Sequence, residues 1–588
     1  MTENWSCARS IIRKLRECGV DTAFGVTGGH VVPLLDACAR ENIRVIAFRD
    51  ERSASFAAAA YGALMRRPAL CLVTAGPGVT NAVTGVAQAH YANWPVISLV
   101  GCFEAGSVGR GALQELAQDQ LMSTVSKWAK TLPQAERGAE FAELAYQASM
   151  TAPRGHAHLS VPIDLVTRPV PKRLNDKSEH RPLARRSGVD ELTLTAIVDR
   201  IKEAKRPLII AGSGLWQAAD DQVLLRFVEQ TGIPVFTHEE ARGLIPDSHP
   251  LCLGSMIYKL NPAVNWLAQA DLLLLVGTVI DWRVNFLQPP FVAATATQLL
   301  LTSDAHARLP SSSPYLHVVA DEALALAQVG ARLGSASEQH AEWAAILKTK
   351  NLQATAVFAQ QEKAVVARTS ASVAPPASTK VLSAAEVPSA QEQTAPSLIH
   401  PLEIAQTIEA IRQTYNANII FDGGNIGKWG KFAVTAERVG QWGRLKGGFG
   451  AIGHGLSSAI VRKLTDYARP AVLLTGDGAF GYDVMELEVC IQENLPVITV
   501  IAVDGAWGSV QTGLATRYLE STDSMYTRLP LTRFDQLAQA LGAQGLWIDR
   551  LEDLAPALHK AIASKQTWVL AVHTQTVQSP ATYATDSY

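Results

Sequence analysis

The stretch that decides the fold is TGDGAFGYDVMELEVCIQENLPVITVIAVDGAWG, residues 475–508. It joins two continuous apolar runs, AVLLT (471–475) and VITVIAV (497–503), through a segment with helix-like patterning. Such runs are typical of strands that are covered on both faces of a sheet. The stretch therefore predicts one strand–helix–strand unit, whose two strands end at the same carboxyl edge, where ligands bind in open α/β sheets.

Each of these two runs ends in an aspartate followed by glycine. If the strands are neighbours they lie about 4.8 Å apart, so that Asp477 and Asp504 could ligate one hard cation. Either aspartate alone is more simply interpreted as a strand-end cap or a turn residue. Their pairing across one unit favours the metal interpretation.

The same alternation of short β-rich runs and alanine-rich helical stretches occurs three times along the chain. It predicts an α/β fold with three doubly wound parallel-sheet domains. We place an N-terminal domain at 1–180, a central domain at 190–345 and a C-terminal domain at 399–588. Residues 350–398 include an Ala/Ser/Pro-rich stretch with few large apolar side chains, which predicts a linker.

Composition narrows the class of protein. The chain has 588 residues, 48% of them hydrophobic and 18% charged, with a formal net charge of -2. These values predict a globular protein with no electrostatic footprint for nucleic acid, and no apolar run is long enough for a membrane span. The N-terminus lacks the apolar core of a signal peptide, and the seven cysteines form no CxxC pair. We expect a cytoplasmic protein that acts on small molecules.

Residues 475–508 resemble the signature of thiamin diphosphate-dependent enzymes. The chain is similar to the branch of that family that includes acetolactate synthase, benzaldehyde lyase and 2-hydroxyacyl-CoA lyase. The family's GDG is Gly476, Asp477 and Gly478, and its paired asparagines fall on Val503 and Asp504. A carboxylate thus replaces a carboxamide at the second ligand; we expect Mg²⁺ binding to be retained. The resemblance implies a metal site formed by Asp477, Asp504 and Ala506.

Further blocks resemble the same family. RVIAFRDERSASFAAAAYGA (44–63) places Glu51 where the family has the glutamate that hydrogen-bonds the aminopyrimidine of the cofactor. LVTAGPGVTNAV (72–83) resembles the family's turn that lies against the cofactor. FDGGNIGKWG (421–430) resembles a glycine-rich segment whose N–H groups bind the diphosphate. GGFGAIGHGLSSAI (447–460) resembles the block whose bulky residue, here Ile452, holds the cofactor bent. The implied cofactor-binding residues are Gly76, Pro77, Gly78, Asn81, Gly424, Asn425, Ile426, Gly450, Ile452, Gly476, Gly478, Ala479 and Trp507.

Two residues of the N-terminal block could face a substrate. His30 follows a predicted strand, and Gln114 lies in RGALQELAQ. Benzaldehyde lyase-like enzymes have a histidine and a glutamine in such places. The segment around Gln114 resembles acetolactate synthases equally well. Together with Glu51, these two residues form the predicted catalytic set.

The resemblance implies a carbon–carbon bond-forming or -cleaving enzyme acting on a 2-oxo acid, aldehyde or acyloin. We expect a 2-oxo acid decarboxylase or carboligase like acetolactate synthase. A benzaldehyde lyase-like acyloin lyase, a 2-hydroxyacyl-CoA lyase and a non-catalytic cofactor-binding paralogue are the alternatives. The resemblance also implies a homodimer or homotetramer whose sites form between subunits. GTVIDWR (277–283) resembles a flavin-site motif without its first arginine, so FAD or ADP in the central domain is not favoured.

Overall fold

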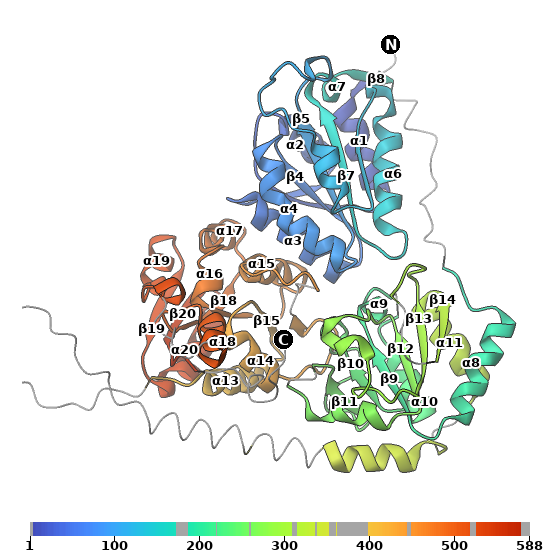
Figure 1. The fold of residues 1–588 in the computed structure, drawn as a ribbon. Coiled ribbons are helices and arrows are strands. Elements are labelled where there is room, and N and C mark those ends of the chain that lie inside the picture. Colours follow the sequence, from blue (N-terminus) through green and yellow to red (C-terminus); the bar gives the residue numbers. More distant parts are fainter. Residues whose placement is uncertain are drawn as a thin grey trace, which may run out of the picture.

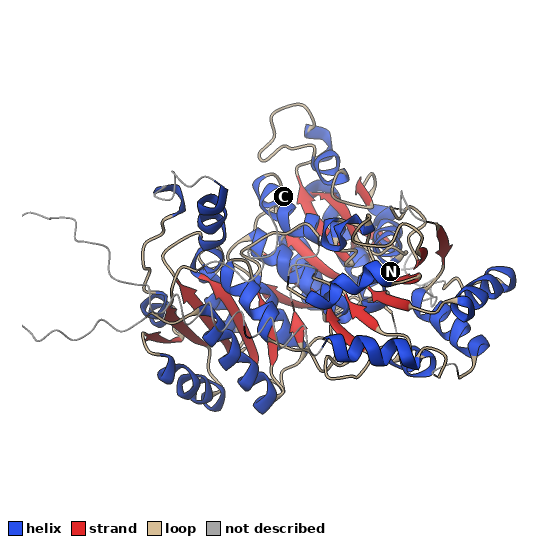
Figure 2. Cartoon of the chain, turned by 60° about the horizontal axis from the view of Figure 1, so that its bottom comes forward, coloured by secondary structure: helices blue, strands red, loops and turns tan. Residues whose placement is uncertain are grey.

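The computed structural model describes residues 4–171, 186–218, 220–257, 260–308, 314–335, 338–351, 360, 398–443, 448–517 and 525–577. They form three α/β domains, each around a six-stranded sheet (Figure 1). Every strand pair within these three sheets is parallel, and helices lie on their faces (Figure 2). This confirms the predicted fold class. Most of the predicted linker lies outside the described residues.

The N-terminal sheet has the strand order β3-β2-β4-β5-β7-β6, and a short antiparallel pair, β1 and β8, lies beside it. Its strands are β1 Asn4–Ser6, β2 Thr22–Gly25, β3 Arg44–Ala47, β4 Ala69–Val73, β5 Val96–Cys102, β6 Trp128–Thr131, β7 His156–Pro162 and β8 Pro169–Pro171. Its helices are α1 Cys7–Glu17, α2 Val32–Arg40, α3 Glu51–Met65, α4 Pro77–Tyr91, α5 Gln118–Ser123, α6 Gly138–Met150 and α7 Ile163–Val166.

The central sheet has the order β11-β10-β9-β12-β13-β14. Its strands are β9 Pro207–Ala211, β10 Val235–Thr237, β11 Cys252–Ser255, β12 Leu272–Val276, β13 Thr297–Thr302 and β14 Tyr315–Val319. Its helices are α8 Glu191–Glu203, α9 Ser213–Trp216, α10 Val223–Thr231 and α11 Glu322–Leu333.

The C-terminal sheet has the order β16-β15-β17-β18-β20-β19. Its strands are β15 Asn418–Phe421, β16 Trp442–Gly443, β17 Ala471–Gly476, β18 Val497–Val503, β19 Gln544–Ile548 and β20 Trp568–His573. Its helices are α13 Pro401–Tyr415, α14 Asn425–Ala433, α15 Gly455–Thr465, α16 Asp477–Phe480, α17 Leu487–Gln492, α18 Gly508–Arg517, α19 Phe534–Ala540 and α20 Leu551–Ser564. The segment between β17 and β18 is broken into α16, a 3₁₀ turn (Val484–Glu486) and α17.

The first and third domains share one apolar core. Helix α3 packs on both α4 and α15 (Figure 1), and its run Ala57–Ala60 is almost completely buried. Alanine side chains allow the helix axes to approach closely, which explains the small-residue run that follows Glu51. The start of α3 is thereby fixed against the C-terminal domain of the same chain.

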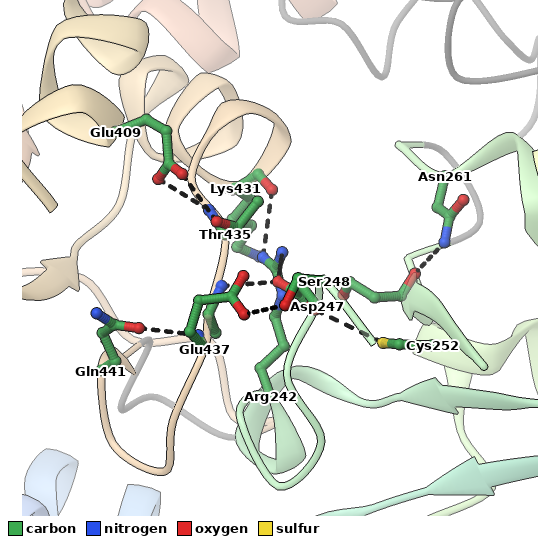
Figure 3. A network of polar contacts seen from close by, with 12 residues as sticks. Arg242, Asp247, Ser248, Cys252, Asn261, Glu409, Lys431, Thr435, Glu437 and Gln441 are labelled. Carbon is green, nitrogen blue, oxygen red and sulfur yellow. Dashed lines mark hydrogen bonds and ion pairs between the residues drawn. The ribbon is translucent and has the colours of Figure 1, made fainter. Parts of the chain in front are cut away.

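The central and C-terminal domains are joined by a polar network (Figure 3). The carboxylate of Asp247 accepts hydrogen bonds from the guanidinium of Arg242, at 2.6 Å, and from the backbone N–H of Ala436, at 2.7 Å. The side chains of the ion pair are only 6% and 7% exposed. Because both charges are buried and hydrogen-bonded, removal of one would leave the other uncompensated.

Two findings agree with the composition. All seven cysteines are free thiols, and every one except Cys18 is buried. Within the described residues, no helix combines the length and the apolar character needed to cross a membrane.

Candidate functional site

The two aspartates of the deciding stretch leave the same edge of the C-terminal sheet. Strands β17 and β18 are parallel neighbours, with Gly476 opposite Ala502, so that Asp477 and Asp504 follow directly at adjacent strand ends. Asp477 accepts a hydrogen bond from the backbone N–H of Gly505 at 2.9 Å. The expectation that the strands are neighbours is thus confirmed.

Burial raises the pKa of both carboxyl groups. The pKa of Asp477 rises to about 6. That of Asp504 rises to about 7, through burial first and the neighbouring charge of Asp477 second. Two buried carboxylates that repel each other are stabilised when a cation lies between them. The described residues contain no group of three or more His, Cys, Asp or Glu side chains that could hold a metal, so further ligands would have to be backbone carbonyls, water or a phosphate.

A cavity of about 180 Å³ opens beside these aspartates. Helix α14 begins at its wall without a side-chain cap, after Gly424 at φ 93°, so its first N–H groups are free for an anion. The Oδ1 atom of Asn425 is buried and has no hydrogen-bond partner among the described residues. An uncapped helix start, an orphaned polar atom and a carboxylate pair fit a diphosphate with its divalent cation. The lining residues are Pro401, Gly424, Asn425, Ile426, Ile452, Gly476, Asp477, Gly478, Ala479, Ala502, Asp504, Ala506, Trp507, Gly508, Ser509, Val510, Thr574 and Gln575.

Glycines keep this cavity open where larger residues would fill it. A Cβ on Gly478 would lie 2.7 Å from the indole ring of Trp507, and one on Gly423 would lie 2.3 Å from Cγ2 of Ile452. Thus the bulky residues at both walls pack directly on glycine backbone. Gly450, the remaining residue predicted for this half, does not line the cavity, and a Cβ on it would meet no atom within 4 Å.

One residue that the sequence analysis missed shapes the wall behind Ile452. Asp422 is 2% exposed and accepts hydrogen bonds from the backbone N–H groups of Gly453, His454 and Gly455 at 3.3, 3.1 and 2.8 Å. It ties the end of β15 to the start of α15. The sequence contains the pattern that would have identified Asp422, because this aspartate follows the apolar run NIIF just as Asp477 and Asp504 follow their apolar runs.

In the N-terminal domain, Glu51 begins α3 and lies against α4. Asp50 caps the helix, accepting from the N–H groups of Arg52 and Ser53. The Oε2 atom of Glu51 accepts a hydrogen bond from Asn81 at 3.0 Å, and its Oε1 atom would lie 3.4 Å from a Cβ on Gly78. A methyl group at Gly78 would therefore come into van der Waals contact with the carboxylate.

The other two predicted catalytic residues lie against the same loop, Thr74–Gly78, at the carboxyl end of β4. The Nδ1 atom of His30 lies 3.3 Å from the hydroxyl of Thr74. Gly76 packs on Gln114: an added Cβ would lie 2.9 Å from the Cβ atom of Gln114 and 3.0 Å from its carbonyl oxygen. The structure thus brings Glu51, His30 and Gln114 together around one loop.

The two groups of predicted residues do not share one cavity within a single chain. Every described residue that lines the cavity beside Asp477 belongs to the C-terminal domain, whereas Glu51, His30, Gln114 and the Gly76 turn belong to the N-terminal domain. The predicted residues therefore form two separate groups, an N-terminal half-site around Glu51 and a C-terminal half-site around Asp477 and Asp504.

A larger cavity, of about 660 Å³, lies at the carboxyl ends of the central strands and reaches the N-terminal domain. Gly214, Gly277 and Asp321 line it on one side and Lys127 on the other. Burial lowers the pKa of Lys127 to about 8. Part of the GTVIDWR motif lines it as well, with Arg283 paired to Asp281 at 2.9 Å.

Comparison with known proteins places this geometry in a family. Three models match in succession: the thiamine pyrophosphate enzyme N-terminal TPP binding domain at residues 6–122, the central domain at 194–329, and the C-terminal TPP binding domain at 422–572. Their order along the chain is that of the three sheets.

Relatives resemble the chain over almost its whole length. A probable acetolactate synthase of Mycobacterium bovis is 29% identical, covering 95% of this chain and 93% of that protein. The 2-hydroxyacyl-CoA lyase 1 of Dictyostelium discoideum is 24% identical over 95% of each. The same fold occurs in a solved structure, that of the Rhodococcus jostii thiamine diphosphate-dependent 4-hydroxybenzoylformate decarboxylase. The TM-score is 0.78 at 18% sequence identity, and the match covers 98% of this chain and 100% of that one.

Both half-sites lie in matched TPP binding domains, one at the end of β4 and the other at the ends of β17 and β18. The chain therefore belongs to the thiamine pyrophosphate enzyme family and is a thiamin diphosphate-dependent enzyme.

Proposed function

We propose that the protein is a Mg²⁺-dependent 2-oxo acid decarboxylase and carboligase similar to acetolactate synthase. The observation that carries this proposal is the buried pair Asp477 and Asp504 beside the uncapped start of α14. The 29% identity to acetolactate synthases favours a 2-oxo acid donor. An acyloin or 2-hydroxyacyl-CoA lyase is the second candidate, favoured by several lyases among the relatives at 23–27% identity.

Asp477, Asp504 and the backbone carbonyl of Ala506 would hold the cation. The first N–H groups of α14, with Gly424 and Asn425, would hold the diphosphate. Ile452 and Trp507 pack on glycine backbone at opposite walls, so each is rigid enough to orient the cofactor ring system. The bound cofactor supplies a nucleophilic carbon and an electron sink for breaking the bond next to a carbonyl group.

The N-terminal half-site would handle protons. Asn81 occupies Oε2 of Glu51, which leaves Oε1 to hold and transfer a proton at the aminopyrimidine. Thr74 lies at Nδ1 of His30, which leaves Nε2 for a substrate proton. Gln114, whose backbone has φ 61°, would supply its carboxamide as a hydrogen-bonding group for the substrate.

A complete site would need two subunits. Because the two half-sites occupy separate places in one chain, Glu51 of one copy would complete the cofactor cavity of a second copy, which requires a homodimer or a larger homo-oligomer. For the central cavity, Val279 in place of an arginine removes a phosphate-binding charge, so we do not propose a flavin there.

The first experiment is an incubation with thiamin diphosphate, Mg²⁺ and pyruvate, with and without an aldehyde acceptor, in which CO₂ and hydroxyketone are quantified. Release of CO₂ with a ligated product supports the carboligase. If CO₂ is absent but an acyloin or a 2-hydroxyacyl-CoA is cleaved, the lyase replaces it.

Glu51→Gln tests the assigned proton transfer. We expect a fall in kcat of at least about a hundredfold, because general acid–base groups contribute 10²–10⁴-fold. Glu140→Gln, a change of the same chemistry on the exposed face of α6, is the matched control and should leave kcat unchanged. Wild-type turnover by a folded Glu51→Gln protein would refute the role.

A further inference from the structure

A continuous chain of polar side chains crosses the core of the N-terminal domain. Ser98 on β5, three residues on β7 (His156, His158 and Ser160) and Gln118 at the start of α5 are each 3% exposed or less. Strands β5 and β7 are parallel neighbours, with Ser98 opposite His158. The residues on β7 alternate in sequence and so share one face of the strand. A polar row at positions that normally carry core residues requires an explanation.

The hydrogen bonds of the row run without a gap between two backbone groups. The N–H of Gly76 donates to Oε1 of Gln118 at 3.1 Å, and Nε2 of Gln118 donates to the hydroxyl of Ser160 at 3.0 Å. That hydroxyl lies 2.8 Å from Nε2 of His158, whose Nδ1 lies 2.8 Å from the hydroxyl of Ser98.

At the far end of the row, the hydroxyl of Ser98 lies 2.7 Å from Nε2 of His156. The Nδ1 atom of this histidine lies 2.9 Å from the carbonyl oxygen of Val125 and 2.9 Å from the hydroxyl of Ser126. The row therefore begins at the amide of Gly76 and ends at the carbonyl of Val125.

These two ends fix the direction of every bond. A carbonyl oxygen only accepts, so Nδ1 of His156 must carry a hydrogen. Burial lowers the pKa of His156 to about 4 and that of His158 to about 3, so both rings are neutral. It follows that Nε2 of His156 accepts from Ser98, that Ser98 accepts from Nδ1–H of His158, and that Nε2 of His158 accepts from Ser160. Ser160 is then the acceptor for Gln118, and the hydroxyl of Ser126 shares Nδ1–H of His156 with the carbonyl of Val125 as a second acceptor.

The row ends on the loop around which the predicted catalytic residues gather. Gly76 has φ 59° and begins α4 without a side-chain cap. Gly76 contacts Gln114, and the next turn of the same segment contacts Glu51 through Gly78 and Asn81. A shift of the Gly76 amide would therefore move Gln114 and the contacts of Glu51, which belong to the predicted catalytic set.

We propose that Gln118 is a positioning residue, which holds the Gly76 turn in its active geometry through this one-way hydrogen-bond chain. The link to catalysis rests on the proposed function. A bonded row of this kind is cooperative, so that each member restrains the next, and the rigid strands β5 and β7 anchor it.

The tautomers test the chain without any measurement of activity. Ring-¹⁵N-labelled protein, with signals assigned by single His→Gln variants, should show His156 and His158 neutral at pH 7 with the hydrogen on Nδ1. If either ring is charged or carries its hydrogen on Nε2, the chain is wrong. This measurement is made on the wild-type protein, and it decides even if the enzyme uses a different substrate.

Gln118→Glu tests the direction. A carboxylate can accept from Gly76 but cannot donate to Ser160, so the hydroxyl of Ser160 turns its hydrogen to the carboxylate. Because the carbonyl of Val125 still holds the hydrogen on Nδ1 of His156, Ser98 still accepts from Nδ1–H of His158. The Nε2 atom of His158 must then gain a second proton, which it donates to Ser160. A His158 ring that carries no hydrogen on Nε2 in a folded Gln118→Glu protein whose carboxylate is ionised would overturn the proposal.

Gln118→Leu tests the consequence, with Gln120→Leu on the exposed face of the same short helix as the matched control. We expect kcat to fall by about ten- to a hundredfold, as for a displacement of about 1 Å in a catalytic group, while thiamin diphosphate affinity changes by less than about threefold. The control should change neither. Equal kcat for the two variants, or a loss of cofactor binding that accounts for the whole effect, would refute the positioning role.

Discussion

Replacing Glu486 by glutamine should change how stability depends on pH. Glu486 is 1% exposed and accepts hydrogen bonds from the backbone N–H groups of Arg49 and Asp50 at 3.1 and 3.2 Å. These residues immediately precede Glu51, so the C-terminal domain holds the start of the helix that carries it. Burial raises the pKa of Glu486 from 4.5 to about 7.

The sign follows from which state holds the proton. Between pH 4.5 and about 7 the folded protein keeps a proton that the unfolded chain has released, so the unfolding free energy falls as pH rises through this window. The difference between the two pKa values corresponds to at most about 3 kcal/mol. Glutamine does not titrate, and its single carboxamide oxygen can keep only one of the two hydrogen bonds from the backbone of Arg49 and Asp50. The variant should therefore be less stable than the wild type at pH 5, and the difference should shift in its favour by up to about 3 kcal/mol between pH 5 and pH 8, because only the wild type loses stability as Glu486 ionises.

Thermal unfolding of the cofactor-free protein from pH 5 to pH 8 measures this difference. For a cooperative unit of 150–250 residues, about 3 kcal/mol corresponds to roughly 6–12 °C in Tm. Glu488→Gln removes a carboxylate from the neighbouring helix but leaves Glu486 in place, so it should keep the wild-type pH slope. Parallel Tm curves for the wild type and Glu486→Gln would refute the reasoning.

Three further substitutions test the site and the contact between domains. Gly478→Ala should weaken thiamin diphosphate binding at least about tenfold, because its methyl group would lie 2.7 Å from the indole ring of Trp507 and force that ring to shift. Gly481→Ala, at an exposed helix end, should not weaken binding, and titration of the cofactor by tryptophan fluorescence compares the two variants. Asp504→Ala should raise the Mg²⁺ concentration for half-maximal cofactor binding at least about tenfold, and unchanged metal dependence would contradict its role as a ligand. Arg242→Ala should destabilise the protein by about 3 kcal/mol, because it leaves the buried carboxylate of Asp247 without its ion-pair partner. Arg226→Ala, which removes an exposed ion pair, should cost less than about 1 kcal/mol. Equal losses of Tm in the two variants would count against the buried network in Figure 3.

The sequence by itself determined the fold class and the sheet edge at which Asp477 and Asp504 follow neighbouring strands. Continuous apolar runs that end in Asp-Gly specify buried parallel strands and their ligand edge, because covered strands need apolar residues on both faces and a local glycine to end them. Asp477 and Asp504 could be found in this way, since each directly follows a strand, whereas Gly424 and Ile452 came from the resemblance to the family.

Only the tertiary structure decided how distant segments meet. Nothing in the local sequence indicates that His30, Glu51 and Gln114 gather around one loop, or that Glu486 holds the helix that carries Glu51, because these contacts depend on strand order and helix packing over long sequence separations. The separation of the two half-sites within one chain is likewise a property of domain placement. The row from His156 to Gln118 shows the same limit: alternation places His156, His158 and Ser160 on one face, but their partners on other elements, and hence the direction of their hydrogen bonds, exist only in the folded chain.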